Sequence, residues 1–546
     1  MKILFFFILF FFLVFTGYPV LFLFWKSTNI SFHLFPVVWS NIAVRESFTN
    51  SILLAIFVTI ATTFIAFPLA LLMHFVKFPG KNFWRKIFLL PLVAPPFVAA
   101  IGMRHILSRF GTINLILMKS GLIEKPVDFL GTGLTGIFIL QVLHLYPIIY
   151  LNILSSLENI DSSCIESAEN LGASFIQTFR KIIFPLALPG YFAGAFLVFI
   201  WSLTDLGTPL VFDYPRLIPV MIFQSLTDIY SNPSGYVCVI IVFLIALLLF
   251  FSTRYFLSKM SFVGVVRYKT VMEPVSVSLP VKIIISAFLC VLLLISILPH
   301  ISVIINSFSQ RWFFTILPDK WTFQYYREVF SHPVAKISLI NSTLYSIITG
   351  LFIVIISICI GLILTRTNIK GKNILESFVI FPMAVPGIVF AFSYVLAFSN
   401  TFLDPRNFPV FLLIISYILR RLPFAVRAIV ANFEQIDVSS EESALNLGAS
   451  RWRTIKNITI PMLKNGIIAG FIFSFAFSMM EVSSSLILVS KQEYFPIAKG
   501  IYQLAGRITD GPYIASALGV IGMFLTFLSL LIIYKLTGKQ NISLSV

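Results

Sequence analysis

Two carboxylates stand in otherwise apolar stretches of this chain, at matched places. Asp205 follows Pro185 at the same spacing at which Glu481 follows Pro461. This spacing, about 20 residues, is about 30 Å of helix, so both acids should lie near the far end of an apolar helix. There they could bind a cationic substrate, line a gate or pair with basic groups. A carboxylate that faces water at a helix end is the alternative.

Basic side chains also occur within apolar stretches. Arg104, beside His105, is a further tentative substrate-path residue, together with Asp205 and Glu481. Arg420 and Arg421 could line a pore, but long basic side chains also reach polar headgroups from within a span. We therefore expect a structural role for these two arginines.

The same constant offset in residue number relates two polar islands. Residues 158–185 read ENIDSSCIESAENLGASFIQTFRKIIFP, and residues 434–461 read EQIDVSSEESALNLGASRWRTIKNITIP. Because the rest of the chain is so apolar, a register kept along the full length of two distant islands indicates a duplicated surface that meets something outside the membrane.

Each island predicts a helix, a turn and a second helix on the membrane surface. Ser163 with Glu166, and Ser439 with Glu442, have the spacing of a capping box, in which the serine oxygen and the acid satisfy free backbone N–H groups. Glycine permits a left-handed turn, so the first helix should end near Gly172 or Gly448. Pro185 and Pro461 suit the first turn of the following span, where no N–H is needed.

The elements that carry these islands are membrane spans. Hydrophobic residues make up 58% of the 546, only 11% are charged, and the mean hydropathy is +0.97, which excludes a soluble globular protein. A span needs roughly 20 apolar residues. The fold class is therefore an all-α membrane protein with about twelve transmembrane helices, near residues 3–24, 50–74, 87–107, 133–155, 184–206, 237–256, 281–304, 340–364, 374–397, 408–428, 462–486 and 513–535.

The chain consists of two parallel homologous halves. Further matches in register extend the repeat on both sides of the islands, among them Asn50-Ser51 with Asn341-Ser342 and Pro91 with Pro382. Six spans separate the islands, and an even number returns the chain to the same face. The predicted organisation is a first helix and outer loop, a first repeated unit, a linker with the seventh helix and an outer loop, and a second repeated unit, at residues 1–45, 46–258, 259–336 and 337–538.

The net charge of +17 follows the topology. Lys and Arg gather in alternate short loops, such as Lys77, Lys81 and Arg85, and such loops stay in the cytoplasm. Both termini and both islands are therefore expected inside a cytoplasmic (inner) membrane. No single basic patch indicates nucleic acid, so contact with anionic lipid accounts for the remaining charge. The four cysteines show no paired spacing, so neither a disulfide framework nor a metal site is expected.

The islands resemble the EAA loops of the permease subunits of binding-protein-dependent ABC importers of the type I fold. The pattern reads Glu166-Ser167-Ala168, Gly172 and Pro185 in one copy, and Glu442-Ser443-Ala444, Gly448 and Pro461 in the other. Serine replaces the first alanine of the family pattern in both copies, which keeps the side chain small. The resemblance implies that these eight residues, Glu166, Ala168, Gly172, Pro185, Glu442, Ala444, Gly448 and Pro461, couple the permease to ATPase subunits.

This resemblance implies partners on both sides of the membrane. Two loops on one chain imply two ABC ATPase subunits inside, an external solute-binding protein outside, and no second permease chain. The sequence has no G-x-x-x-x-G-K-[ST] loop. We therefore expect a permease that is not itself an enzyme and binds no cofactor, with ATP-Mg used by the partner subunits.

The substrate is less well defined by the sequence. Fused permeases of this length, and the stretch SLTDLGTPLVF at 202–212, resemble the ferric-iron group, with thiamine, polyamine and phosphonate as alternatives. An ion-coupled secondary carrier with twelve spans is the more distant alternative, and it leaves the EAA pattern unexplained. A membrane enzyme is a third hypothesis, but the six scattered histidines form no catalytic set.

Overall fold

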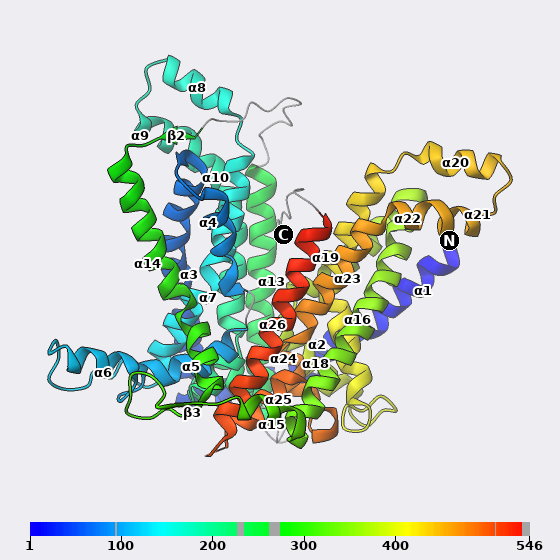
Figure 1. Ribbon diagram of the computed structural model, residues 1–546. Helices are drawn as coiled ribbons and strands as arrows, with labels where there is room; N and C mark the ends of the chain where they lie inside the picture. Colours follow the sequence, from blue (N-terminus) through cyan, green and yellow to red (C-terminus); the bar gives the residue numbers. More distant parts are fainter. Residues whose placement is uncertain (93–94, 227–233, 261–273, 508, 538–546) are drawn as a thin grey trace. The chain divides into compact units, whose positions relative to one another are not determined.

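The computed structural model describes residues 1–92, 95–226, 234–260, 274–507 and 509–537, which form long helices, short connecting helices and two small sheets (Figure 1). Residues 261–273, near the start of the predicted linker segment 259–336, lie outside the described residues. Strand β1 (Val76–Lys77) pairs in parallel with β2 (Val275–Ser276), and β3 (Ser309–Arg311) pairs in antiparallel orientation with β4 (Lys320–Trp321).

The elements from the N-terminus to Met260 are α1 (Lys2–Phe12), η1 (Leu13–Gly17), α2 (Tyr18–Ser40), α3 (Ile42–Phe75), β1 (Val76–Lys77), α4 (Lys81–Ile87), η2 (Leu90–Leu92), α5 (Pro96–Leu107), α6 (Thr112–Lys119), α7 (Leu134–Glu158), α8 (Ser162–Asn170), α9 (Phe175–Thr178), η3 (Phe179–Ile183), α10 (Phe184–Thr204), α11 (Gly207–Val211), α12 (Ile218–Ser225) and α13 (Ser234–Met260).

The elements of the remaining chain are β2 (Val275–Ser276), α14 (Leu279–Ser307), β3 (Ser309–Arg311), β4 (Lys320–Trp321), α15 (Gln324–Ser331), α16 (Pro333–Arg366), α17 (Lys372–Ala384), α18 (Gly387–Phe398), α19 (Pro409–Gln435), α20 (Val438–Asn446), α21 (Arg451–Thr454), η4 (Ile455–Thr459), α22 (Ile460–Met462), α23 (Lys464–Met479), α24 (Ser483–Leu488), η5 (Gln492–Tyr494), α25 (Ile497–Ala505) and α26 (Gly511–Thr537).

The membrane spans confirm the predicted fold class. Among the described residues, nine helices are long and apolar enough to cross a membrane, and the number rises to twelve if each of three bent helix pairs counts as one span. Every one of the twelve predicted stretches corresponds to one of these helices or pairs.

Two of the bent pairs occur at repeated prolines, where the sequence alone had indicated continuous spans. Pro386 precedes α18 in an extended conformation, with ψ 144°, and α17 and α18 meet at 105°. Pro95 is the extended residue before α5, and the helical segments on either side of residues 93–94 differ in direction by 89°. Proline lacks an N–H and disfavours a helical residue before it, so each proline ends one helix and starts the next.

The chain forms two compact units that do not follow its two repeats in sequence. The N-half unit contains Trp39–Met221 and the described part of Leu244–Thr322. The C-half unit contains Met1–Val38, the described part of Ile222–Phe243, and the described part of Phe323–Gln540. The first helix of each half therefore belongs to the unit formed mainly by the other half.

Close contacts hold these exchanged helices in place. In the C-half unit, the Tyr394 hydroxyl of α18 donates a hydrogen bond of 2.7 Å to the carbonyl of Phe15. In the N-half unit, α14 approaches α5 so closely that a Cβ on Gly102 would lie 1.9 Å from the Ser302 hydroxyl. Glycine at position 102 is therefore required for the packing of α14.

The repeated Asn-Ser pairs have the same task in both units. The Ser51 hydroxyl accepts a hydrogen bond of 2.9 Å from the Ile218 N–H, and the Ser342 hydroxyl accepts one of 2.7 Å from the Ile497 N–H. Ile218 and Ile497 each begin a short amphipathic helix, α12 or α25. A buried N–H at a helix start needs such an acceptor, which accounts for the repeat at these positions.

Candidate coupling loops and charge clusters

Each polar island forms a helix–turn–helix at one end of its unit. In the N-half unit, α8 lies at one end of α7 and α10, while α5 and α6 lie at the opposite end (Figure 1). In the C-half unit, α20 lies at one end of α19, and α15 and α25 lie at the other (Figure 1). We call α8 with α9 and η3 the first coupling loop, and α20 with α21 and η4 the second coupling loop.

Aspartates, and not the predicted serines, cap the first helix of each loop. The carboxylates of Asp161 and Asp437 accept hydrogen bonds of 3.1 and 3.0 Å from the N–H groups of Ser163 and Ser439. The serines lie inside the helices, so the predicted capping boxes with Glu166 and Glu442 are wrong. These hydrogen bonds also lower the pKa of Asp437, because they stabilise its charged form.

The structure has the left-handed glycine turns that the sequence predicts. Gly172 and Gly448 have φ of 80° and 86°, a left-handed conformation that glycine adopts without strain. In the first loop, the N–H of Ala173 donates to the carbonyl of Ala168 and the N–H of Gly172 to that of Glu169, at 3.0 and 2.9 Å. The second loop repeats both hydrogen bonds, at 3.0 Å each. This pair of bonds is the Schellman motif, which satisfies the last carbonyls of the helix.

The second helix of each loop runs into the next span through a turn of π-helix. Ser174 caps α9, and Gln177 completes a capping box there. The N–H of Phe184 then donates to the carbonyl of Phe179, which gives the wider turn. Pro185 follows within the first turn of α10, as predicted, but no break precedes it.

The second loop differs at this point. Pro461 lies in the short helix α22, and the segment Arg451–Met462 meets α23 at 71°. The two loops therefore share their caps and turns but join their spans differently.

Both loops expose leucine at the tip. Leu171 is 88% exposed and Leu447 is 89% exposed, each directly before the turn glycine. Ala168 and Ala444 lie half-buried one turn earlier, and no atom outside the local chain lies within 4 Å of a Cβ built on either turn glycine. Exposed leucine beside small residues gives a partner protein an apolar surface that it can approach closely.

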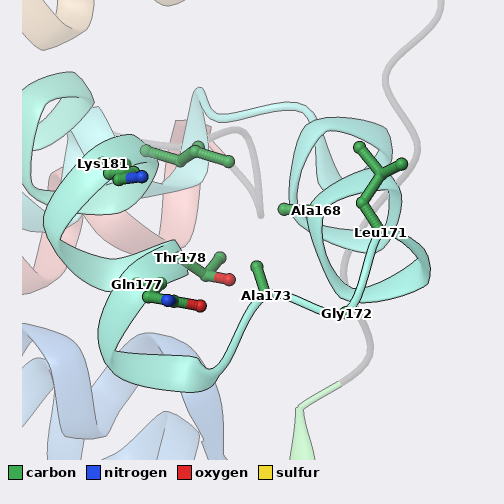
Figure 2. A pocket seen from close by; sticks show the side chains of 8 residues that line it. Ala168, Leu171, Gly172, Ala173, Gln177, Thr178 and Lys181 are labelled. Atoms are coloured by element: carbon green, nitrogen blue, oxygen red, sulfur yellow. The ribbon is translucent and has the colours of Figure 1, made fainter.

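A cleft of about 230 Å³ lies between the helices of the first loop. Figure 2 shows Ala168 of α8 and Leu171, which directly follows α8, on one side of it, with Gln177 and Thr178 of the second helix on the other. Within the part of the chain that the structure describes, the buried hydroxyl of Thr178 has no hydrogen-bond partner. The cleft is therefore polar on one side and apolar on the other, and it opens on the exposed surface of the loop.

Asp205 and Arg104 lie at opposite ends of the short helix α11. The Asp205 carboxylate accepts hydrogen bonds from the Thr208 N–H at 3.3 Å and from the Gln141 amide at 3.0 Å. Arg104 donates to the carbonyl of Val211 at 2.8 Å and pairs with Asp213 at 2.7 Å. An acid at the start of a helix and a base at its end both stabilise the helix dipole.

Glu481 and Lys499 hold helix α24 of the C-half unit in the same way. The Glu481 carboxylate accepts hydrogen bonds from the N–H groups of Ser484 and Ser485 and pairs with Arg420 at 2.7 Å. At the other end, the Lys499 ammonium donates to the carbonyl of Leu486 at 2.9 Å. Burial lowers the pKa of Lys499 to about 8.

The structure therefore gives each tentative substrate-path residue a structural partner within its own unit. A role of Asp205, Glu481 and Arg104 in transport stays a prediction. Sequence reasoning missed Gln141 and Lys499, because the matched positions in the other half carry the unlike residues Tyr417 and Val220. It also missed Glu441, which pairs with Arg366 beside the second coupling loop.

The comparisons with known proteins agree with this geometry. Residues 40–262 and 357–540 match the family model described as binding-protein-dependent transport system inner membrane component. The chain is similar to the putative ferric transport system permease protein FbpB 1 of Haemophilus influenzae, with 31% identity over 81% of this chain and 70% of the relative. A ferric transport system permease protein FbpB of Actinobacillus pleuropneumoniae is 30% identical over 87% of this chain and 68% of its own.

The class of protein is thus a multi-pass inner-membrane permease. The chain belongs to the family of inner membrane components of binding-protein-dependent transport systems, and it is a fused ABC importer permease of the type I fold that carries the family domain twice. A spermidine/putrescine permease protein, PotB of Escherichia coli, is 32% identical but matches only 28% of this chain.

Proposed function

We propose that this chain forms the whole translocation path of an ATP-driven importer of ferric iron, and that its two coupling loops each receive one ATPase subunit. The observation that carries the proposal is the duplicated loop surface. Both loops present the same Schellman turn, the same half-buried alanine and the same exposed leucine. When the same exposed surface occurs in both halves of a chain, the two copies are expected to bind two identical partners.

The remaining partners and the orientation follow from the same proposal. The coupling loops and both termini lie in the cytoplasm, and a solute-binding protein delivers the substrate from the opposite side. ATP-Mg is bound and hydrolysed by the two ATPase subunits, while this chain supplies no nucleotide site, no cofactor and no metal centre of its own. No second permease chain is required, and residues 46–258 and 337–538 serve as the two permease units.

Ferric iron is proposed as the substrate because two relatives that are 30–31% identical over more than four-fifths of this chain are described as ferric transport permeases. Uptake of radiolabelled substrates by the permease with its ATPase and solute-binding protein tests the assignment. Saturable uptake of ferric iron supports it, and uptake of thiamine, a polyamine or a phosphonate in its place contradicts it.

Substitution of the turn glycines tests the coupling assignment. Gly172→Val and Gly448→Val force a β-branched side chain into a left-handed conformation, which costs about 1–2 kcal/mol per residue. The Schellman turn should open, and both ATPase co-purification and uptake should fall. Because the added side chain meets nothing outside the loop, the membrane core should stay folded.

Gly121→Val is the matched control. Gly121 has φ of 72° and the same open surroundings, but it follows α6, at the opposite end of the N-half unit from the first coupling loop (Figure 1). The control should retain ATPase binding and uptake. Unchanged uptake in the double variant of Gly172 and Gly448 would contradict the docking assignment.

A further inference from the structure

Beside the second coupling loop, a mostly buried ion pair joins the loop to the membrane helices. Arg366, the last residue of α16, donates from Nε to the Glu441 carboxylate of α20 at 2.8 Å. The two side chains are only 13% and 12% exposed. Removing a charge from a pair this deep leaves the other charge without its counter-ion in poor contact with water.

The ion pair connects four elements. The Arg366 guanidinium also donates to the carbonyls of Phe433 and Ile436, at 3.3 and 3.2 Å, where α19 ends, and it lies over the Phe433 ring. On the other side, the Glu441 carboxylate accepts a hydrogen bond of 2.9 Å from the hydroxyl of Thr459, in the π-helical turn before α22. The network therefore fixes α20 to the end of two spans and to the start of a third.

The first coupling loop has apolar residues at the same three positions. In the register that matches Asn50 with Asn341, Arg366 corresponds to Phe75. In the register of the two islands, Glu441 corresponds to Ile165 and Thr459 to Ile183. All three matched residues are buried. The two loops thus use different chemistry, although their caps, turns and exposed leucines are alike.

We infer that Arg366 and Glu441 are positioning residues for coupling in the second half of the permease, and that apolar packing has this task in the first half. The inference rests on the proposed function. Movement of an ATPase subunit against α20 is passed to α16, α19 and the α22–α23 span through a charged network, whose geometry is directional. Apolar packing is not directional, so it depends on shape alone.

Uptake per ATP hydrolysed is the measurement that separates positioning from mere stability. The experiment uses the full permease with its ATPase and binding protein in proteoliposomes, and radiolabelled ferric iron as the probe. Glu441→Gln keeps the shape of the side chain but removes its charge. Uptake per ATP should fall about tenfold or more, since each 1.4 kcal/mol of lost interaction corresponds to a factor of ten, while ATP hydrolysis and co-purification persist.

The chain itself supplies the rescue and the control. The triple variant Arg366→Phe, Glu441→Ile and Thr459→Ile carries the residues of the first loop, and it should restore most of the uptake per ATP. Glu434→Gln removes an exposed acid from the end of α19, shortly before Glu441 in the chain, and should behave as the unmodified protein.

Three results would overturn the inference. One is a Glu441→Gln protein with normal uptake per ATP. Another is a monodisperse, folded triple variant that is no better coupled than Glu441→Gln. If both variants lose their folded elution peak, the pair acts on fold stability and the positioning role is also refuted. Failure of the proposed function is distinguishable, because the unmodified permease would then neither bind the ATPase nor require ATP.

Discussion

Truncation of the exposed leucines should weaken ATPase binding without disturbing the permease. Leu171 and Leu447 are almost fully exposed in the isolated chain, so neither contributes to its folded core. If each side chain becomes buried in an ATPase subunit, Leu→Ala removes three carbon atoms from the interface. At about 0.8 kcal/mol for each buried carbon, the loss is about 2.4 kcal/mol per site.

This loss corresponds to an increase in Kd of about 50-fold at each site. The assay is biolayer interferometry with the permease in nanodiscs and the purified ATPase in solution, together with a thermal melt of the permease alone. Each single variant should weaken ATPase binding at one coupling loop and leave the other loop unaffected. The double variant should weaken ATPase binding at both loops. The melting temperature should stay unchanged, because an exposed side chain that makes few contacts stabilises the fold very little.

Leu122→Ala is the matched control for this prediction. Leu122 is 73% exposed but follows α6, outside the coupling loops, so its truncation should leave the Kd unchanged. A change of less than about threefold in the double variant would refute the reasoning that the leucines enter the partner, given the size expected from burial. A large fall in melting temperature would refute the claim that they are free surface residues.

Three further predictions concern other parts of the chain. The pKa of Asp437 is lowered in the folded loop, so its helix cap is fully effective above the unfolded pKa of about 3.9 and is lost as the pH falls through the lower folded value. Amide exchange in α20, corrected for intrinsic rates, should therefore become faster at that low pH in the unmodified protein. The Asp437→Asn variant should not show this acceleration. Glu481→Gln leaves Arg420 without its counter-ion and should destabilise the C-half unit by about 3–5 kcal/mol, measured as a lower thermal midpoint; lost uptake at an unchanged midpoint would instead assign Glu481 to the substrate path. Gly102→Leu should prevent α14 from packing against α5, because even a Cβ at this position would lie 1.9 Å from the Ser302 hydroxyl, and it should lower the thermal midpoint of the permease.

The span pattern and the loop turns could be predicted because they depend on local sequence. Apolar length defines a span, and glycine before a second helix predicts a left-handed turn, as Gly172 and Gly448 show. The caps were harder to predict, because Asp161 and Ser163 are both good N-cap residues. The helix begins at Ser162, so the N-cap position directly before it is occupied by Asp161.

Long-range partners could not be predicted from the sequence. Arg366 and Glu441 are far apart in the chain, and the repeat predicts no such pair, because the matched residues in the first half are apolar. Hydropathy also gives each span the same character, so it does not show that α14 packs against α5 of the other half. The matched prolines, such as Pro386, were visible, but whether a proline kinks or breaks a span depends on its neighbours in space.

The central claim is that a separate ATPase drives this permease through its two coupling loops. Proteoliposomes that contain the unmodified chain, with or without the ATPase subunits, test it most directly by uptake of radiolabelled ferric iron from its binding protein. The account predicts uptake only when ATPase and ATP are both present, and no effect of collapsing the proton and sodium gradients. Uptake by the chain alone down an imposed ion gradient would contradict it.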